Sequence, residues 1–259
     1  MHYINLRNTN ITFYSMFGTN QNADYSIGNP AGTLVGSAVV NAGQLEILND
    51  TTGLLEYIAT NNADSAQVGT VLFKITPNFN TAGTYSQSIF FTSKGEADQT
   101  NQIALSMADV GSGGGITLQA NDSAGAGIFS SLYSSYPFVL GTQYVMQINY
   151  DFNAGNTRLY ISGVQHGLTQ FETGTRTPAE IGMFRFGVGW DIYSSSPCNF
   201  SLDDICIFKT VQPPIDDYTI GYEFAFPSNL PTLVKLYGFV YDTSAFLTSL
   251  DIKVRPYEA

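Results

Sequence analysis

Residues 143–167 read QYVMQINYDFNAGNTRLYISGVQHG, and this stretch decides the fold class. Apolar and polar residues alternate on both sides of DFNAGN, residues 151–156. Because successive side chains of a β-strand point to opposite faces, this spacing predicts two strands that each bury one face. Asn and Gly adopt positive backbone φ angles at little cost, so DFNAGN predicts a hairpin connection. Gly163 predicts a second turn, after which the chain continues as another short strand.

Other segments repeat this alternation. In TVLFKIT, residues 70–76, the apolar side chains of every second residue share one face. In DDICIF, residues 203–208, the pattern places Asp203, Ile205 and Ile207 opposite Asp204, Cys206 and Phe208. Clusters of Gly, Asn and Ser separate these segments, and no segment has the 3.6-residue period of a helix. The sequence therefore predicts an all-β fold, a sandwich rather than a barrel, with Ile161 and Ile207 in its core.

The composition suits a large β domain with a weakly charged surface. Only 12% of the 259 residues are charged, so uncharged polar residues must supply most of the surface. Lys and Arg number 10 against 21 Asp and Glu, and the net charge of −11 argues against nucleic-acid binding. No run of 18 apolar residues exists, so we expect no membrane insertion. The first ten residues lack the apolar segment of a signal peptide, so we expect none.

Cysteine and proline usage divide the chain. If Cys198 and Cys206 lie on one extended strand, they are too far apart to bridge, so we expect two unbridged thiols. After residue 209, four prolines occur within 19 residues, which argues against central strands there. We therefore predict a main β domain at residues 1–209. Residues 210–259 would form a Pro-rich arm and a β-hairpin extension that packs on its own domain or serves assembly with a neighbour.

Five segments carry a family resemblance. They are VGTVLFKITPNF (68–79), LGTQYVMQINYD (140–151), TRLYISGVQHG (157–167), EIGMFRFGVG (180–189) and SLDDICIF (201–208). Over residues 24–209 their order resembles the laminin-G-like, concanavalin A-like lectin and glucanase superfamily. The resemblance implies an antiparallel two-sheet jelly-roll sandwich. Gln143 stands where the family often has Trp, and Ser162 where it often has Asn before the turn glycine. The fold hosts lectins, glycosidases, lyases, adhesion modules and virion proteins, so it does not fix the function.

The sequence favours a protein without catalytic activity. Glycosidases of the resembling family carry Glu-x-Asp-x-x-Glu along one strand, and this triplet is absent. Asp203 and Asp204 are adjacent, so in a regular strand they would face opposite ways. The alternative is a carbohydrate-active enzyme, a glycosidase or a polysaccharide lyase. A lyase would need a base with polar neighbours, and the group that would suit this role is His166 with Tyr160, Arg158 and Gln165. The other interpretation is that His166 is an ordinary histidine in a surface loop.

Candidate binding residues lie in predicted loops. Trp190, Asp191, Tyr193 and His166 are candidates for contact with a glycan, because an aromatic face stacks on sugar C–H groups while polar groups bond the hydroxyls. The alternative is that Trp190 caps one end of the core. The resemblance implies calcium as the one cofactor to consider, with oxygen ligands from Asp24, Asp203 or Asp204.

Together these observations predict a non-catalytic, lectin-like structural or attachment module. The absent signal peptide and the weakly charged surface favour a virion component or another protein of the extracellular surface. Its expected partners are other copies of itself, neighbouring virion proteins and cell-surface glycans.

Overall fold

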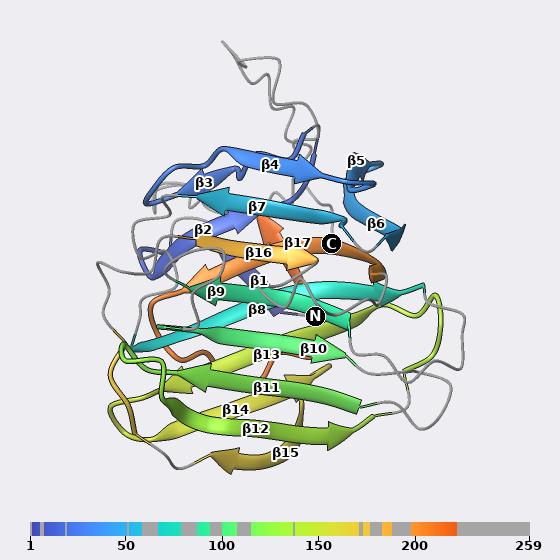
Figure 1. Cartoon of the computed structure of the whole chain (residues 1–259). Coiled ribbons are helices and arrows are strands. Elements are labelled where there is room, and N and C mark those ends of the chain that lie inside the picture. The colour runs from blue at the N-terminus through green and yellow to red at the C-terminus, as the bar shows by residue number, and fades with distance from the viewer. Residues whose placement is uncertain are drawn as a thin grey trace, which may run out of the picture.

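The computed structural model describes residues 2–5, 8–18, 20–50, 52–58, 67–78, 87–93, 100–107, 115–136, 138–170, 173–176, 183–187 and 198–221. Every regular element in these ranges is a β-strand. Two large sheets stack face to face, and a two-stranded sheet lies beside them (Figure 1). The predicted all-β, antiparallel jelly-roll sandwich is confirmed. The described residues contain no helix long and apolar enough to cross a membrane.

The first sheet has seven strands. Their spatial order is β12 (Gly127–Ser135), β11 (Gly115–Asn121), β10 (Ile103–Met107), β9 (Gln87–Ser93), β16 (Met183–Gly187), β7 (Leu54–Ile58) and β4 (Gly32–Val35). All neighbours in this sheet are antiparallel.

The second sheet has nine strands, and its main path runs β15 (Val164–Gln170), β14 (Asn156–Ile161), β13 (Tyr144–Asp151), β8 (Val68–Pro77), β17 (Cys198–Phe208), β2 (Ile11–Ser15) and β3 (Tyr25–Ser26). Strand β6 (Gln44–Asp50) also pairs with β17, and β5 (Val39–Asn41) pairs with β6. The third, two-stranded sheet joins β1 (His2–Asn5) to β18 (Tyr218–Gly221) in parallel.

The predicted hairpin is present with its expected register. Strands β13 and β14 pair from Met146 opposite Ile161 to Asp151 opposite Asn156. Ser162 and Gly163, with φ of 46° and 79°, then turn the chain into β15. Asn and Gly accept such angles more readily than Ser does, so Ser162 is an unusual residue for this turn.

The main core lies between the two large sheets. Ile161 and Ile207 are 1% and 0% exposed, which confirms their predicted burial. Phe13, Phe184 and Tyr57 interlock at the centre, with the Phe13 ring 4.7 Å from Phe184 and 4.9 Å from Tyr57 in edge-to-face contacts. Such contacts add specificity to the apolar burial that stabilises the sandwich.

Both cysteines lie on β17, as predicted. They form no disulfide, and both are buried. Cys198 belongs to the core between the sheets, whereas Cys206 belongs to a second apolar cluster on the outer face of the nine-stranded sheet. A regular strand would place these two residues, an even number of positions apart, on the same face. The bulge described next adds one residue between them and thereby puts them on opposite faces.

One prediction about β17 is wrong. Asp203 pairs with Lys74 and Cys206 pairs with Leu72, so three steps along β17 match two along β8. Asp204 has φ of 48°, and both Leu202 and Ile205 lie in the main core. This β-bulge leaves Asp203 and Asp204 together on the outer side, instead of on opposite faces.

A third layer covers part of that outer face. We call residues 210–221 the strap. Ile215, Tyr218 and Ile220 of the strap pack with Ile4 of β1 in the second apolar cluster. The first twelve residues of the predicted extension therefore lie on their own domain. Residues 222–259 fall outside the described residues, so the predicted boundary at residue 209, the hairpin and its role in assembly stay predictions.

Candidate functional site

A group of rings closes the sandwich where the two large sheets meet at one side. Strand β12 ends the seven-stranded sheet, β15 ends the nine-stranded sheet, and these edge strands lie side by side (Figure 1). Tyr136 directly follows β12, and His166 lies on β15. Their ring centroids are 4.8 Å apart with an interplanar angle of 87°. An edge-to-face pair therefore joins the two sheets.

Two further rings support this pair. Phe138 lies 4.5 Å from Tyr136 and 5.1 Å from Tyr144, measured between ring centroids. The Tyr144 hydroxyl accepts a hydrogen bond of 2.8 Å from the Val139 backbone N–H. Phe138 is buried, whereas Tyr136 and His166 keep part of their surface in water. We call Tyr136, Phe138, Tyr144 and His166 the aromatic edge.

Apolar side chains extend the aromatic edge into solvent. Val139 and Val164 are 60% and 61% exposed, and Leu140 is 44% exposed. Val164 pairs with Ile161 and His166 pairs with Leu159, so Val164 and His166 share the inner side of β15. Single exposed aliphatic residues are ordinary, but here three of them flank half-buried rings. This arrangement provides an apolar surface with polar atoms at its rim.

Desolvation favours the neutral forms of the two half-buried rings of the aromatic edge, His166 and Tyr136. Desolvation lowers the pKa of His166 below its ordinary value, which favours the neutral imidazole. Desolvation also raises the pKa of Tyr136, followed by the influence of Tyr144, so its phenol stays protonated. Neutral rings with hydroxyl and imidazole nitrogen groups can stack on C–H surfaces and exchange hydrogen bonds with hydroxyl groups.

The structure separates the residues of the lyase alternative. His166 lies opposite Leu159 on the inner side of β15, whereas Gln165 lies opposite Tyr160 on the outer side. Arg158 lies opposite Asn149, also on the outer side. His166 and Tyr160 therefore face opposite sides of the sheet and do not form one constellation. The other predicted glycan contacts, Trp190, Asp191 and Tyr193, lie outside the described residues.

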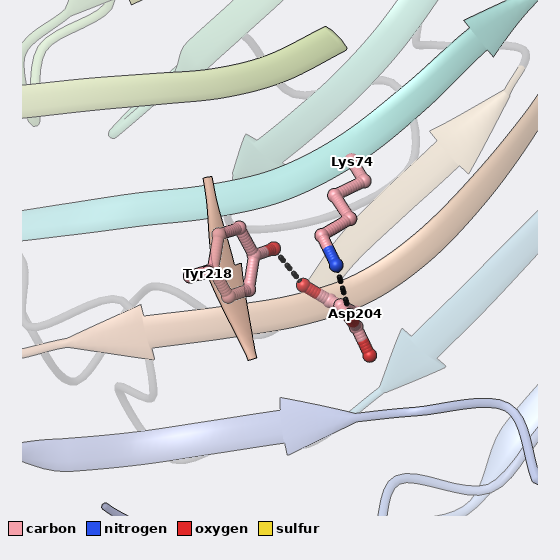
Figure 2. Close-up of polar contacts among 3 residues, drawn as sticks. All are labelled: Lys74, Asp204 and Tyr218. Atoms are coloured by element: carbon pink, nitrogen blue, oxygen red, sulfur yellow. Dashed lines mark hydrogen bonds and ion pairs between the residues drawn. The ribbon is translucent and has the colours of Figure 1, made fainter. Parts of the chain in front are cut away.

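A second polar group lies under the strap on the outer face of the nine-stranded sheet. Lys74 Nζ forms an ion pair of 2.6 Å with Asp204 Oδ2, and Lys74 lies 4.7 Å from the Tyr218 ring centroid (Figure 2). The Tyr218 hydroxyl donates a hydrogen bond to the backbone carbonyl of Asp204. Tyr218 is fully buried. These contacts anchor the strap to β8 and β17.

Asp203 shares this environment and titrates unusually. Desolvation first, and then the charge of Asp204, raise its pKa to about 6, although Lys74 opposes the rise. The charge of Asp204 also acts on Asp24. Partial desolvation raises the pKa of Asp24, a 2.7 Å hydrogen bond from the Met16 backbone N–H lowers it, and Asp204 raises it further. The bulge creates this crowding, which sequence alternation could not reveal.

The calcium candidates lie in a charged environment that contains a lysine. Asp204 raises the pKa of both Asp24 and Asp203, and Lys74 forms an ion pair with Asp204. Within the described part of the chain, no three or more His, Cys, Asp or Glu side chains are placed to hold a metal ion.

Two buried arginines were not singled out from the sequence. Arg185 on β16 forms an ion pair with Glu56 on the neighbouring β7. Arg176 is fully buried, and its Nε and Nη2 donate hydrogen bonds of 2.9 and 2.7 Å to the Asn101 carbonyl. Its guanidinium lies 6.0 Å from the Tyr150 ring centroid. An Arg in a loop has no sequence signal for burial, since Arg is normally exposed.

Comparison with known proteins supports the fold. No family model matches the chain, and no curated protein sequence does. The binding domain of botulinum neurotoxin serotype D is similar in structure, with a TM-score of 0.58 and 14% identity, over 79% of this chain and 49% of that one. This chain therefore spans about half the length of that binding domain.

Two further solved structures share the fold. Domain 4 of AbnA, an extracellular arabinanase from Geobacillus stearothermophilus solved with arabinotriose, has a TM-score of 0.54 and 16% identity, over 79% of this chain and 94% of that one. The sialidase of Trypanosoma rangeli has a TM-score of 0.55 and 11% identity, over 79% of this chain and 31% of that one. At these identities the likeness concerns the fold alone. The chain has the fold of a two-sheet jelly-roll sandwich.

Proposed function

We propose that this protein is a non-catalytic, glycan-binding attachment module of the concanavalin A-like kind. The observation that carries the proposal is the aromatic edge, where the half-buried rings of Tyr136 and His166 meet beside exposed Val139 and Val164. Sugar rings present C–H faces and equatorial hydroxyls together, and a neutral aromatic surface with rim hydrogen-bond groups complements both.

The structural neighbours add support at the level of the fold. One of them is a toxin binding domain, and another was solved with the trisaccharide arabinotriose bound. These proteins carry their own binding residues, so the proposal for this chain rests on the aromatic edge.

The non-catalytic part of the proposal rests on two arrangements. His166 and Tyr160 face opposite sides of the sheet, so they cannot act together on one uronate. Asp203 and Asp204 do lie together, but Asp204 pairs with Lys74 beneath the buried Tyr218. A glycosidase needs two carboxyl groups on either side of an accessible bond.

We also propose that the module works on an outer surface, such as that of a virion, in company with copies of itself. A weakly charged, polar-uncharged composition and a net charge of −11 favour solubility without attraction to nucleic acid.

A glycan array tests the binding proposal. We expect the wild-type chain to bind a defined set of glycans, and Tyr136→Ala to lower the affinity about tenfold or more. Tyr25→Ala is the matched control, because Tyr25 is a 43% exposed aromatic residue on β3, at the edge of the nine-stranded sheet opposite to β15. Absence of glycan binding, or equal loss in both variants, would refute the assignment.

Incubation with a panel of polysaccharides tests the non-catalytic proposal. We expect no new reducing ends and no unsaturated products. Cleavage that His166→Ala abolishes would establish the enzymatic alternative.

In the glycan array described above, Trp190→Ala tests whether the predicted loop with Asp191 and Tyr193 contributes to binding.

A further inference from the structure

Polar side chains of the nine-stranded sheet bind the main chain of the strap. The Asn149 side-chain amide donates a 2.7 Å hydrogen bond to the Gln212 carbonyl, and the Gln147 amide donates one of 3.0 Å to the Pro213 carbonyl. In return the Gln147 side-chain oxygen accepts a 2.9 Å bond from the Ile215 N–H. Both amide side chains are buried. Gln147 therefore holds the strap on both sides of its two prolines.

Thr70 completes this set. Its hydroxyl accepts a 3.0 Å hydrogen bond from the Gln212 N–H and donates one of 2.7 Å to the Asn149 side-chain oxygen. Thr70, Gln147 and Asn149 come from two adjacent strands, β8 and β13, and face the same way. Because these contacts go to backbone atoms, they recognise an extended chain by its shape.

Apolar and aromatic contacts supply the sequence preference. Ile215 and Tyr218 of the strap are 2% and 0% exposed, and they pack in one cluster with Leu72 and Val145. Lys74 and Asp204 hold the Tyr218 ring and hydroxyl. Side-chain hydrogen bonds to an extended backbone, beside buried apolar side chains, are contacts suited to peptide recognition. We call this strap-covered surface of β8 and β13 the groove.

The prolines prepare the strap for this groove. Pro213 and Pro214 fix φ and lack N–H groups, so the segment stays extended and leaves no donor unsatisfied between Gln212 and Ile215. The connection into the strap is open to water, since Val211 is 48% exposed. Close fit continues at the β14–β15 turn, where a Cβ on Gly163 would lie 3.0 Å from Asp216 Cβ.

We propose that this groove is a peptide-binding site whose partner in assembly is the strap of a second copy of the chain. The groove fits residues 212–221 of any copy equally well, so exchange between copies keeps every contact. The chain's own strap is favoured only by its covalent connection to β17. This connection gives the strap an effective concentration at the groove of order millimolar. Dense display of copies on a surface therefore favours exchange, while dilute chains stay closed. This inference is independent of glycan binding.

A peptide-binding experiment tests the groove. The receptor is the full chain with Ile215→Ala and Tyr218→Ala, which weakens its own strap, and the probe is a labelled peptide of residues 210–221, TVQPPIDDYTIG. We expect saturable binding to the variant, about tenfold or more tighter than to the wild-type chain. A control peptide carrying the same two alanines should not bind. Adding Gln147→Ala to the receptor should lower the affinity about tenfold or more.

Native mass spectrometry of the wild-type chain tests the partner and covers the case in which the double variant does not fold. Two mass-labelled preparations are mixed near millimolar concentration, opened with mild denaturant and refolded together. We expect mixed dimers, and we expect an excess of the 210–221 peptide to suppress them, because the peptide competes with the strap of the second copy for the groove. Mixed dimers that the peptide leaves unchanged, their complete absence, or a folded double variant that ignores the peptide would overturn the proposal.

Discussion

The two ends of strand β13 close the sandwich in different ways, although both use aromatic rings. At the end of β13, the Arg176 guanidinium lies over Tyr150 and Phe152 and is itself fully buried. At its beginning, Tyr144 supports Tyr136 and His166, which stay partly in water. At the first end the buried Arg176 guanidinium, which bonds the Asn101 carbonyl, covers the rings. No buried cation lies over the described rings at the second end. We call the Arg176 side the closed end and the Tyr136 side the open end. Ring burial stabilises the closed end, whereas the open end leaves ring surface available for the proposed glycan binding.

Arg176→Ala should give the largest effect. It removes two charge-assisted bonds to the Asn101 carbonyl and leaves a cavity above two rings, which together cost about 4 kcal/mol of unfolding free energy. Urea denaturation followed by fluorescence measures the loss. Arg158→Ala, which changes a half-buried arginine on the outer face, should cost about 1 kcal/mol or less. Equal losses in the two variants would remove the distinction between the ends.

A matched pair of phenylalanines sharpens the comparison. Phe152 and Phe138 are 1% and 3% exposed, so Phe→Leu at either should cost about 1.5 kcal/mol of unfolding free energy. Only Phe138→Leu should also weaken glycan binding, about threefold or more, because Phe138 positions Tyr136 and Tyr144. Calorimetric titration with the array-selected glycan checks this. Loss of affinity in Phe152→Leu as well would mean that the closed end takes part in binding.

A change of pH should alter the free energy of unfolding through Asp203, which lies near the strap, and not through the residues of the closed end. The pKa of Asp203 is about 6 in the folded chain, above its ordinary value of 3.8. The folded state therefore binds the proton more strongly than the unfolded state does. Stability from this group rises as pH falls through 6, by at most about 1 kcal/mol between pH 7 and pH 5. Urea midpoints across this range should show the rise, and Asp203→Asn should flatten it. An unchanged slope in Asp203→Asn would assign the effect elsewhere.

The smallest expected effect concerns the turn beside the open end. Ser162 has φ of 46°, a conformation that Asn adopts more readily. Ser162→Asn should therefore raise the unfolding free energy by about 0.5 kcal/mol and leave glycan affinity unchanged. Thermal denaturation measures the gain. Ser162→Val, with a β-branched side chain, should instead lower stability.

Local alternation predicted the parts of the fold that obey it. The hairpin of β13 and β14 and the burial of Ile161 and Ile207 follow from the period of two, and the unbridged cysteines follow from the length of strand between them. The same rule was wrong at Asp203 and Asp204, because a bulge adds one residue to β17 and no residue type announced it.

The site residues were harder to predict for a different reason. Gln147 and Asn149 alternate with apolar residues, so the sequence places them on a face that is either solvated or covered by a second layer. Only the fold shows that the strap covers them. Tyr136 has no local signal either, since its contact with His166 joins strands from different sheets. His166 was identified, but its partner depends on a contact across 30 positions of the chain that only the fold reveals.

The division of the two thiols across β17 has a practical consequence. Cys206 lies in the cluster that the strap covers, and burial raises its pKa, so an alkylating reagent can reach a reactive thiolate there only after Tyr218 lifts away. Cys198 lies between the sheets and becomes reachable only when the sandwich itself opens. Mass spectrometry of the two cysteine peptides after timed labelling thus yields two separate rates. The labelling rate of Cys206 reports opening of the strap, and that of Cys198 reports global unfolding.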